Sequence, residues 1–157
     1  MSYTKIGKDL LAAKVFENGL FNNQNEISLL TNLADTYRNL NKLKESEDLL
    51  IRASKINDKD LYVLISYGRL KISQGKTEEA INYFNSVYKI DKNFNDVILR
   101  IANAYLSIRN FNEAKTICKN IGYPVLIKAS GGGGGKGMKV VRKEDEFENL
   151  FLTAKTE

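Results

Sequence analysis

The sequence predicts a mainly α-helical protein built from stacked helical hairpins, followed by a short strand–loop–strand–helix segment over residues 121–157. Three observations support this fold class. The chain repeats with a period of 34 residues, each period contains two amphipathic segments, and a run of five glycines between two apolar stretches interrupts the pattern after residue 121. Internal repetition at this period is typical of solenoid proteins, in which each unit buries its apolar face against the next.

Three units align without gaps when Ile27–Asp60, Leu61–Phe94 and Asn95–Lys128 are set one beneath another. Within each unit, apolar residues recur three and four positions apart, which is the spacing of one buried helix face. Small residues share a column in each helix: Ala34, Gly68 and Ala102 in the first, and Ser46, Ala80 and Ala114 in the second. Small side chains let two helices approach closely, so we expect each unit to be a helical hairpin with a turn at Asn41, Gly75 and Arg109.

The same frame continues toward the N-terminus. One period before Ser46 stands Ala12, and one period before Leu50 stands Phe16. We therefore expect Asp9–Leu20 to be the second helix of a half-unit, which either caps the array or remains from a longer one.

These columns resemble the tetratricopeptide repeat over about residues 8–121. The unit Leu61–Phe94 matches best, with Tyr67, Gly68, Gly75, Ala80 and Phe84 in the signature positions. Tyr37 and Tyr105 occupy a further tyrosine position, where the middle unit has Lys71. Asp58 and Lys92 stand where a proline usually ends each unit. The resemblance implies a solenoid of about three repeats plus an N-terminal half-repeat, which we assign to a domain over residues 1–120.

The remaining residues, 121–157, follow a different pattern. We expect a strand before the glycines, a second strand from Met138 to Arg142, and a helix from Asp145 to about Lys155 that opens with capping-box spacing. The glycine run fails the Walker A pattern because Ser130 and Gly137 stand where that motif needs other residues. The spacing Gly132, Gly134, Gly137 fits a dinucleotide fingerprint, but that fingerprint opens a helix and here a strand follows. A flexible linker is a further interpretation.

The stretch from Ile121 to Met138 reads Ile-Gly-Tyr-Pro-Val-Leu-Ile-Lys-Ala-Ser-Gly-Gly-Gly-Gly-Gly-Lys-Gly-Met, and it resembles the glycine-rich loop of ATP-grasp biotin carboxylases. The resemblance covers about residues 112–157. It implies that the lysine of the first strand contacts ATP phosphates and that backbone N–H groups of the loop cradle the triphosphate. The implied nucleotide-binding residues are Lys128, Gly131, Gly132, Gly133, Gly134, Gly135, Lys136, Gly137 and Met138.

The resemblance covers a small fraction of a biotin carboxylase, and the groups that bind adenine, Mg²⁺, bicarbonate and biotin have no counterpart in the sequence. The acids Glu144, Asp145, Glu146 and Glu148 cluster at a helix start, where the helix dipole favours them over a metal role. A segment this short also needs support to fold, and we expect it to dock on the last hairpin. A fusion, a chimera and a truncated gene product all remain open as its origin.

The first helix of each repeat is expected to line a concave groove. In that groove the frame places Tyr62, Ile65 and Ile72 as an apolar pocket between Arg38 and Arg69, and Asn103 in the third unit. Thr31 and Asp35 stand where a carboxylate clamp for chaperone tails would need basic and amide residues, so we do not expect chaperone binding. We expect a peptide with an apolar anchor beside an acidic residue.

Composition excludes several function classes. The chain has no histidine and one cysteine, Cys118, which rules out catalytic triads that need histidine, internal disulfides and cysteine-rich metal clusters. The net charge of +5 is spread without a basic stripe, and the sequence has neither a long apolar run nor a signal peptide. We therefore expect a cytoplasmic protein-interaction scaffold, with no catalytic or metal residues, no nucleic-acid or membrane partner, and self-association possible through the open end of the array. Cys118 is expected to be a buried small hydrophobe.

The alternative is an ATP-binding fragment of a biotin carboxylase-like ligase that needs the remainder of the enzyme. No cofactor is expected, apart from ATP in that alternative.

Overall fold

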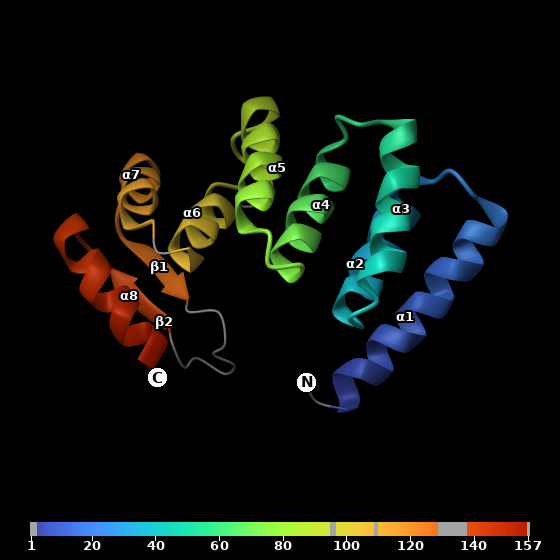
Figure 1. Ribbon diagram of the computed structural model, residues 1–157, viewed down its shortest axis with the longest axis horizontal. Helices are drawn as coiled ribbons and strands as arrows, with labels where there is room; N and C mark the ends of the chain where they lie inside the picture. Colours follow the sequence, from blue (N-terminus) through green and yellow to red (C-terminus); the bar gives the residue numbers. More distant parts are fainter. Residues whose placement is uncertain (1–2, 95–96, 109, 129–137, 157) are drawn as a thin grey trace. The chain divides into compact units, whose positions relative to one another are not determined.

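A computed structural model describes residues 3–94, 97–108, 110–128 and 138–156 (Figure 1). The chain divides into two compact units, Met1–Phe94 and Asn95–Glu157, which are called unit 1 and unit 2 below. The boundary between the units, at residues 94 and 95, comes before residue 121, where the sequence changes from the repeat pattern to the strand and glycine pattern. The reason is that the third predicted hairpin belongs to the same compact unit as the C-terminal segment. Each unit is considered by itself.

Unit 1 consists of antiparallel helices joined by short turns (Figure 1). Its helices are α1 (Tyr3–Asn22), α2 (Ile27–Asn39), α3 (Leu43–Ile56), α4 (Leu61–Ser73) and α5 (Thr77–Ile90). The pairs α2–α3 and α4–α5 are the hairpins expected for Ile27–Asp60 and Leu61–Phe94. The predicted helical-hairpin fold of these two repeats is therefore confirmed.

The core of unit 1 is formed by the columns of the repeat. Leu30, Ala34, Leu50 and Ala53 are completely buried. In the second hairpin, a Cβ added to Gly68 would overlap the ring of Phe84. The glycine is therefore required by a close approach between α4 and α5, as the small-residue column indicates.

The turns and one helix start also follow from local sequence. Asn41 and Gly75 both have positive φ, at 61° and 76°, so the predicted turn positions adopt the left-handed conformation that these residue types tolerate. Helix α4 begins after Asp60, whose side chain accepts hydrogen bonds from the backbone N–H groups of Tyr62 and Val63. Arg109, the third predicted turn position, lies outside the described residues.

Helix α1 is longer than the predicted Asp9–Leu20. It extends from Tyr3 to Asn22, and it packs on α2 through Ala13 and Leu20, which are buried, and Phe16, which is half-buried. Of the two residues on which the half-repeat assignment rests, Phe16 is among these contacts, whereas Ala12 is half-buried and its neighbour Ala13 takes the buried position.

Unit 2 contains the third hairpin and the C-terminal segment. Its elements are α6 (Val97–Ser107), α7 (Phe111–Ile121), β1 (Val125–Lys128), β2 (Met138–Val141), the 3₁₀ helix η2 (Glu144–Glu146) and α8 (Phe147–Thr156). The two strands pair antiparallel, with Val125 opposite Val141 and Lys128 opposite Met138. The mainly-α fold with a small β segment is thus the one predicted.

The C-terminal segment shares one core with the third hairpin. Ala102 and Cys118 from the hairpin pack in the same cluster as Ile127, Val141 and Phe147 from the strands and α8. Two strands alone bury too little apolar surface to be stable in water, so the hairpin of α6 and α7 supplies the missing support. The expected docking of this segment on the last hairpin is therefore present within unit 2.

The last helix starts slightly later than its capping pattern suggests. A 3₁₀ turn precedes it, and the backbone N–H of Arg142 donates to Oε2 of Glu146 at 3.2 Å. Helix α8 then begins at Phe147 and not just after Asp145.

Candidate functional site

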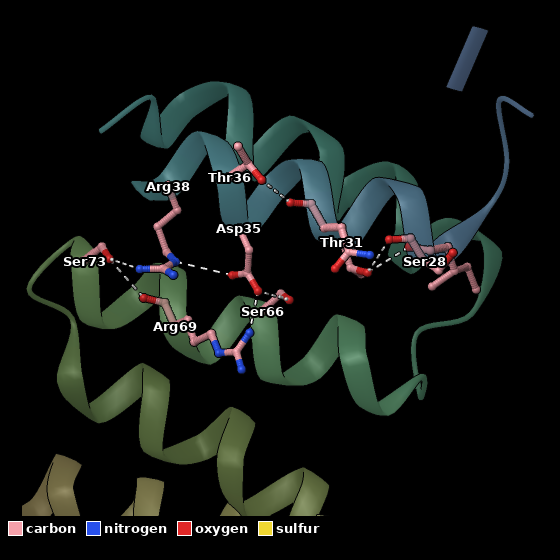
Figure 2. Close-up of polar contacts among 10 residues, drawn as sticks. Ser28, Thr31, Asp35, Thr36, Arg38, Ser66, Arg69 and Ser73 are labelled. Atoms are coloured by element: carbon pink, nitrogen blue, oxygen red, sulfur yellow. Dashed lines mark hydrogen bonds and ion pairs between the residues drawn. The ribbon is translucent and has the colours of Figure 1, made fainter. Parts of the chain in front are cut away.

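An ion-pair cluster joins the first helices of the two complete repeats in unit 1 (Figure 2). Asp35 on α2 accepts from Nε of Arg38 at 3.3 Å and from a terminal nitrogen of Arg69 on α4 at 2.5 Å. Ser66 Oγ donates to the same carboxylate at 3.4 Å, and Arg38 also approaches Ser73 Oγ at 3.5 Å. The three charged side chains are 21–29% exposed, so each still has a face in water.

Two of the predicted apolar groove residues lie on the exposed side of α4. Tyr62 is 57% exposed and packs edge-to-face on Phe94, with 5.1 Å between ring centroids. Ile72 is 42% exposed and lies near the other end of the helix. Because residues at i, i+7 and i+10 share one side of a helix, Arg69 lies between them. This surface, formed by Arg38, Tyr62, Arg69 and Ile72 around Asp35, is called the α2–α4 face below.

Ile65 and Asn103 lie elsewhere. Ile65 is 1% exposed and belongs to the interior of unit 1, so it offers no surface to a partner. Ile65 shares its side of α4 with Tyr62, Arg69 and Ile72, so its burial comes from the neighbouring groups that cover the middle of this side and not from its position on the helix. Asn103 is exposed on α6 in unit 2, and its part in a groove stays a prediction.

The acceptor that organises the two arginines is a feature that sequence reasoning missed. Asp35 is one of the expected groove positions, but the expectation treated Arg38 and Arg69 as charges facing a ligand. In the structure both are partly neutralised by Asp35. The available signal was the spacing, because Asp35 and Arg69 are separated by one repeat period.

A second ion cluster explains the departure of Lys71 from the tyrosine column. Lys71 is 8% exposed, and its ammonium group lies 3.2 Å from Glu47 on α3 and 3.3 Å from Glu79 on α5. Burial lowers the pKa of Lys71, but the hydrogen bonds to the two glutamates outweigh burial and leave that pKa above its ordinary value. The pKa of Glu79 is lowered, mainly by its hydrogen bond to Lys71. The cluster connects three helices and is structural.

Most residues of the proposed nucleotide site lie outside the described part of the chain. These are Gly131, Gly132, Gly133, Gly134, Gly135, Lys136 and Gly137. Lys128 is the last residue of β1 and is paired with Met138, the first residue of β2. The two strands thus hold the ends of this segment opposite each other, and its role in nucleotide binding stays a prediction.

The acids at the start of α8 have partners within unit 2. Glu144 pairs with Lys119 at 3.3 Å, Glu148 pairs with Lys115 at 3.4 Å, and Glu146 accepts from the backbone of Arg142. Among residues 3–94, 97–108, 110–128 and 138–156, no group of three or more histidine, cysteine, aspartate or glutamate side chains is placed to hold a metal ion.

Cys118 is a core residue, as expected. It is 2% exposed in the core of unit 2, and burial raises the pKa of its thiol to about 11. The reactive thiolate is therefore scarce near neutral pH. None of the described helices is both long enough and apolar enough to cross a membrane.

Two kinds of protein-family model match the chain, and their matches overlap at residues 88–94. The tetratricopeptide repeat model matches residues 27–57 and 61–94, and the model for the ATP binding domain of the carbamoyl-phosphate synthase L chain matches residues 88–157. Residues 27–94 are thus similar to tetratricopeptide repeats, and residues 88–157, called the carboxylase-like segment below, are similar to an ATP-binding domain. The two repeat matches coincide with the hairpins α2–α3 and α4–α5.

The carboxylase-like segment is similar to biotin carboxylases. It is 58% identical over 45 residues to biotin carboxylase from Nostoc sp. and 60% identical over 43 residues to that from Haemophilus influenzae. These matches cover 29% and 27% of this chain. A further match is pyruvate carboxylase from Staphylococcus aureus, 48% identical over 50 residues, or 32% of this chain and 4% of that protein. The chain spans about a tenth of the length of the biotin carboxylases that it matches.

The solved structures of MamA share the repeat fold. The structure titled MamA MSR-1 C2 has a TM-score of 0.57 at 24% identity, covering 74% of this chain and 67% of its own. The structure titled MamA AMB-1 C2221 has a TM-score of 0.56 at 25% identity, with 74% and 69% covered. These similarities support a protein-interaction scaffold as the general class of function, because repeat solenoids of this kind use extended surfaces to bind partners.

Proposed function

We propose that the tetratricopeptide repeats bind a segment of a partner protein on the α2–α4 face and that the chain has no catalytic activity of its own. The observation that carries the proposal is the position of Tyr62 and Ile72, which are both exposed on α4 with Arg69 between them. Large apolar side chains grouped beside charged ones are typical of binding surfaces, in which an apolar anchor gives affinity and a polar neighbour gives orientation.

The chemistry of this face favours an acidic residue next to the apolar anchor of the partner. Two arginines share one carboxylate, so the cluster of Arg38, Asp35 and Arg69 keeps one net positive charge. A guanidinium has five N–H donors, and Asp35 uses one from each arginine. Asp35 also holds both side chains in place, which reduces the conformational entropy that they lose when a partner binds.

A display selection with short random peptides tests this function. The bait is the full chain, and the counter-selection uses the variant Tyr62→Ala/Arg69→Ala. We expect peptides with an acidic residue beside a large apolar one to be enriched on the natural chain and lost on the double variant. Ile56→Ala, which truncates another exposed isoleucine on α3, is the control and keeps the enrichment. Enrichment that survives in the double variant would refute the assignment to this face.

A second candidate function follows from the carboxylase-like segment. This segment is 58–60% identical to two biotin carboxylases over 43–45 residues. In that case Lys128, Gly131–Gly137 and Met138 form part of an ATP site, and the remainder of the enzyme supplies the adenine, metal and biotin sites. The test is an amide NMR spectrum of the full chain with increasing Mg-ATP, compared with Lys128→Ala. Saturable shifts of the glycine amides that the variant abolishes favour this candidate. Glycine amide signals that do not shift as Mg-ATP is added favour the scaffold function alone.

A further inference from the structure

The apolar side chains of the α2–α4 face are exposed only at its two ends. Tyr62 is 57% exposed at one end and Ile72 is 42% exposed at the other. Between them on α4, Ile65 and Ser66 are 1% and 3% exposed. A partner that contacts both exposed side chains must therefore span about 15 Å, which is the rise of ten helical positions.

One end of this face is positively charged. Asp35 of α2 pairs with Arg69 of α4, and one turn further along, Arg38 of α2 approaches Ser73 of α4 at 3.5 Å (Figure 2). Because these contacts advance along both helices together, α2 and α4 run in the same direction. Both arginines therefore lie toward the C-terminal ends of the two helices, on the side of Ile72.

The opposite end of the face has two carboxylates. Glu26 and Asp60 precede the first turns of α2 and α4 and share one column of the repeat frame. Asp60 accepts hydrogen bonds from the backbone N–H groups of Tyr62 and Val63, so its charge serves to cap the helix. Glu26 is exposed, makes no such bond with the described residues of α2, and accepts from Ser28 Oγ at 2.9 Å. The charge of Glu26 is therefore available to act on a partner.

The placement of the exposed side chains favours an extended partner segment over a helical one. A helical ligand presents apolar side chains at successive turns and needs a continuous apolar surface to receive them. On α4 this surface is interrupted by the buried Ile65 and by the charged Arg69. An extended chain advances about 3.3 Å per residue, so two side chains about four or five positions apart reach from Tyr62 to Ile72.

We propose that the partner segment is extended and has two apolar residues about four or five positions apart, with its acidic residue beside the one that contacts Ile72. This specificity rests on the proposed function, namely peptide binding at the α2–α4 face. The acidic residue then lies at Arg38 and Arg69, whereas the apolar residue at Tyr62 has no acidic neighbour.

Glu26 is the residue that determines the direction of binding in this arrangement. The two ends of the face are about 15 Å apart, farther than the screening length of about 8 Å at physiological ionic strength. Each end therefore acts on the part of the segment beside it, and a second acidic residue near Tyr62 meets Glu26 and not the arginines. Such a residue weakens binding, although the net charge of +5 by itself would favour any added negative charge.

Fluorescence anisotropy of labelled synthetic peptides, titrated with the full chain, tests the spacing. Each peptide has two leucines in a background of serine and threonine, with an aspartate beside the first leucine. We expect the lowest dissociation constant when the leucines are about four or five positions apart, and one about fivefold higher at about two or about nine positions. Tyr62→Ala weakens the best peptide by about the same factor, but it does not affect a peptide whose second leucine is replaced by alanine.

The role of Glu26 is tested by a second aspartate beside the second leucine. We expect it to raise the dissociation constant of the natural chain about threefold, and Glu26→Gln to abolish this increase. Glu78→Gln is the matched control, since it removes an exposed carboxylate on α5 and leaves the increase unchanged.

The outcomes separate this proposal from the proposed function. Affinity that is independent of spacing, or a second aspartate that does not weaken binding, refutes the proposal. If binding is nevertheless lost in Tyr62→Ala/Arg69→Ala, the proposed function stands without it. Binding that survives in that double variant refutes the assignment to the α2–α4 face, and the absence of binding by every peptide refutes both.

Discussion

Asp35 and Arg69 form an ion pair across one repeat period, since each belongs to the first helix of its hairpin and their positions differ by 34. The pair connects α2 to α4 at the α2–α4 face and also fixes Arg38. One carboxylate thus contributes both to the packing of successive repeats and to the charge of the candidate binding surface.

Asp35→Asn tests the contribution to the packing of successive repeats. The pairs are partly exposed and screened by solvent, so we expect a loss of about 1 kcal/mol or less in the free energy of unfolding. Urea denaturation at low and high salt measures it, and the difference between the chains narrows as salt rises. The double variant Asp35→Asn/Arg69→Met completes the cycle. If the two single substitutions are additive, Asp35 and Arg69 do not interact in solution.

Gly68→Ala is expected to destabilise unit 1 by about 1–3 kcal/mol, because the added methyl group overlaps the Phe84 ring between two packed helices. Gly7→Ala is the matched control on α1. A Cβ at Gly7 meets no other atom within 4 Å, so this substitution stabilises the helix by about 1 kcal/mol or less through helix propensity. Thermal unfolding distinguishes them, and equal melting temperatures for the two variants would contradict the close approach of α4 and α5.

The cluster around Lys71 predicts a specific pH dependence. The folded-state pKa of Glu79 lies below its ordinary 4.5, so the stabilisation is present above that pH and is lost as the pH falls through the folded-state pKa. The folded-state pKa of Lys71 lies above its ordinary 10.5, so its contribution is present below that pH and is lost as the pH rises further.

Lys71→Met removes both effects, and we expect the stability of the variant to change less than that of the natural chain at the two pH extremes. Urea midpoints measured from neutral pH into the acid and alkaline ranges provide the comparison. Lys76→Met is a suitable control, because Lys76 contacts Glu79 at 3.6 Å but is 54% exposed. Parallel pH profiles for the natural chain and Lys71→Met would show that the cluster does not form.

Phe147→Ala is expected to open the core of unit 2. Phe147 is completely buried with Cys118, Ile127 and Val141, and truncation of a buried phenylalanine costs about 3–5 kcal/mol. The reaction of Cys118 with a thiol reagent measures the result, because a buried thiol with a pKa of about 11 reacts slowly in the folded unit. We expect faster labelling in Phe147→Ala and unchanged labelling in Leu152→Ala, whose side chain is 44% exposed. Slow labelling in both variants would mean that α8 does not protect the hairpin of α6 and α7.

The predictable features were those that recur at the repeat period. Gly68 stands in the small column and Phe84 in the aromatic one, so their contact follows from the register alone. Ile65 shows the limit of the method. It lies on the same side of α4 as the exposed Tyr62 and Ile72, and the spacing of residues along a helix does not show which part of a side is covered by its neighbours in space.

Lys71 shows a different limit. The sequence marks it as a departure from the tyrosine column, but its partners Glu47 and Glu79 come from the helices on either side of it. Ion pairs between helices depend on side-chain reach and on how far a charge is removed from water. Neither property is visible in a periodic pattern.

The sequence by itself determined the hairpins, their turns and the change to a carboxylase-like segment, because apolar spacing and glycine placement act locally along the chain. The tertiary structure decided which side chains remain exposed. It paired Arg38 and Arg69 with Asp35, buried Ile65, placed the C-terminal segment in one core with α6 and α7, and left Leu11 and Val15 uncovered on α1. The physical reason is that burial and ion pairing depend on which helices are neighbours in space, whereas helix formation depends on residues a few positions apart.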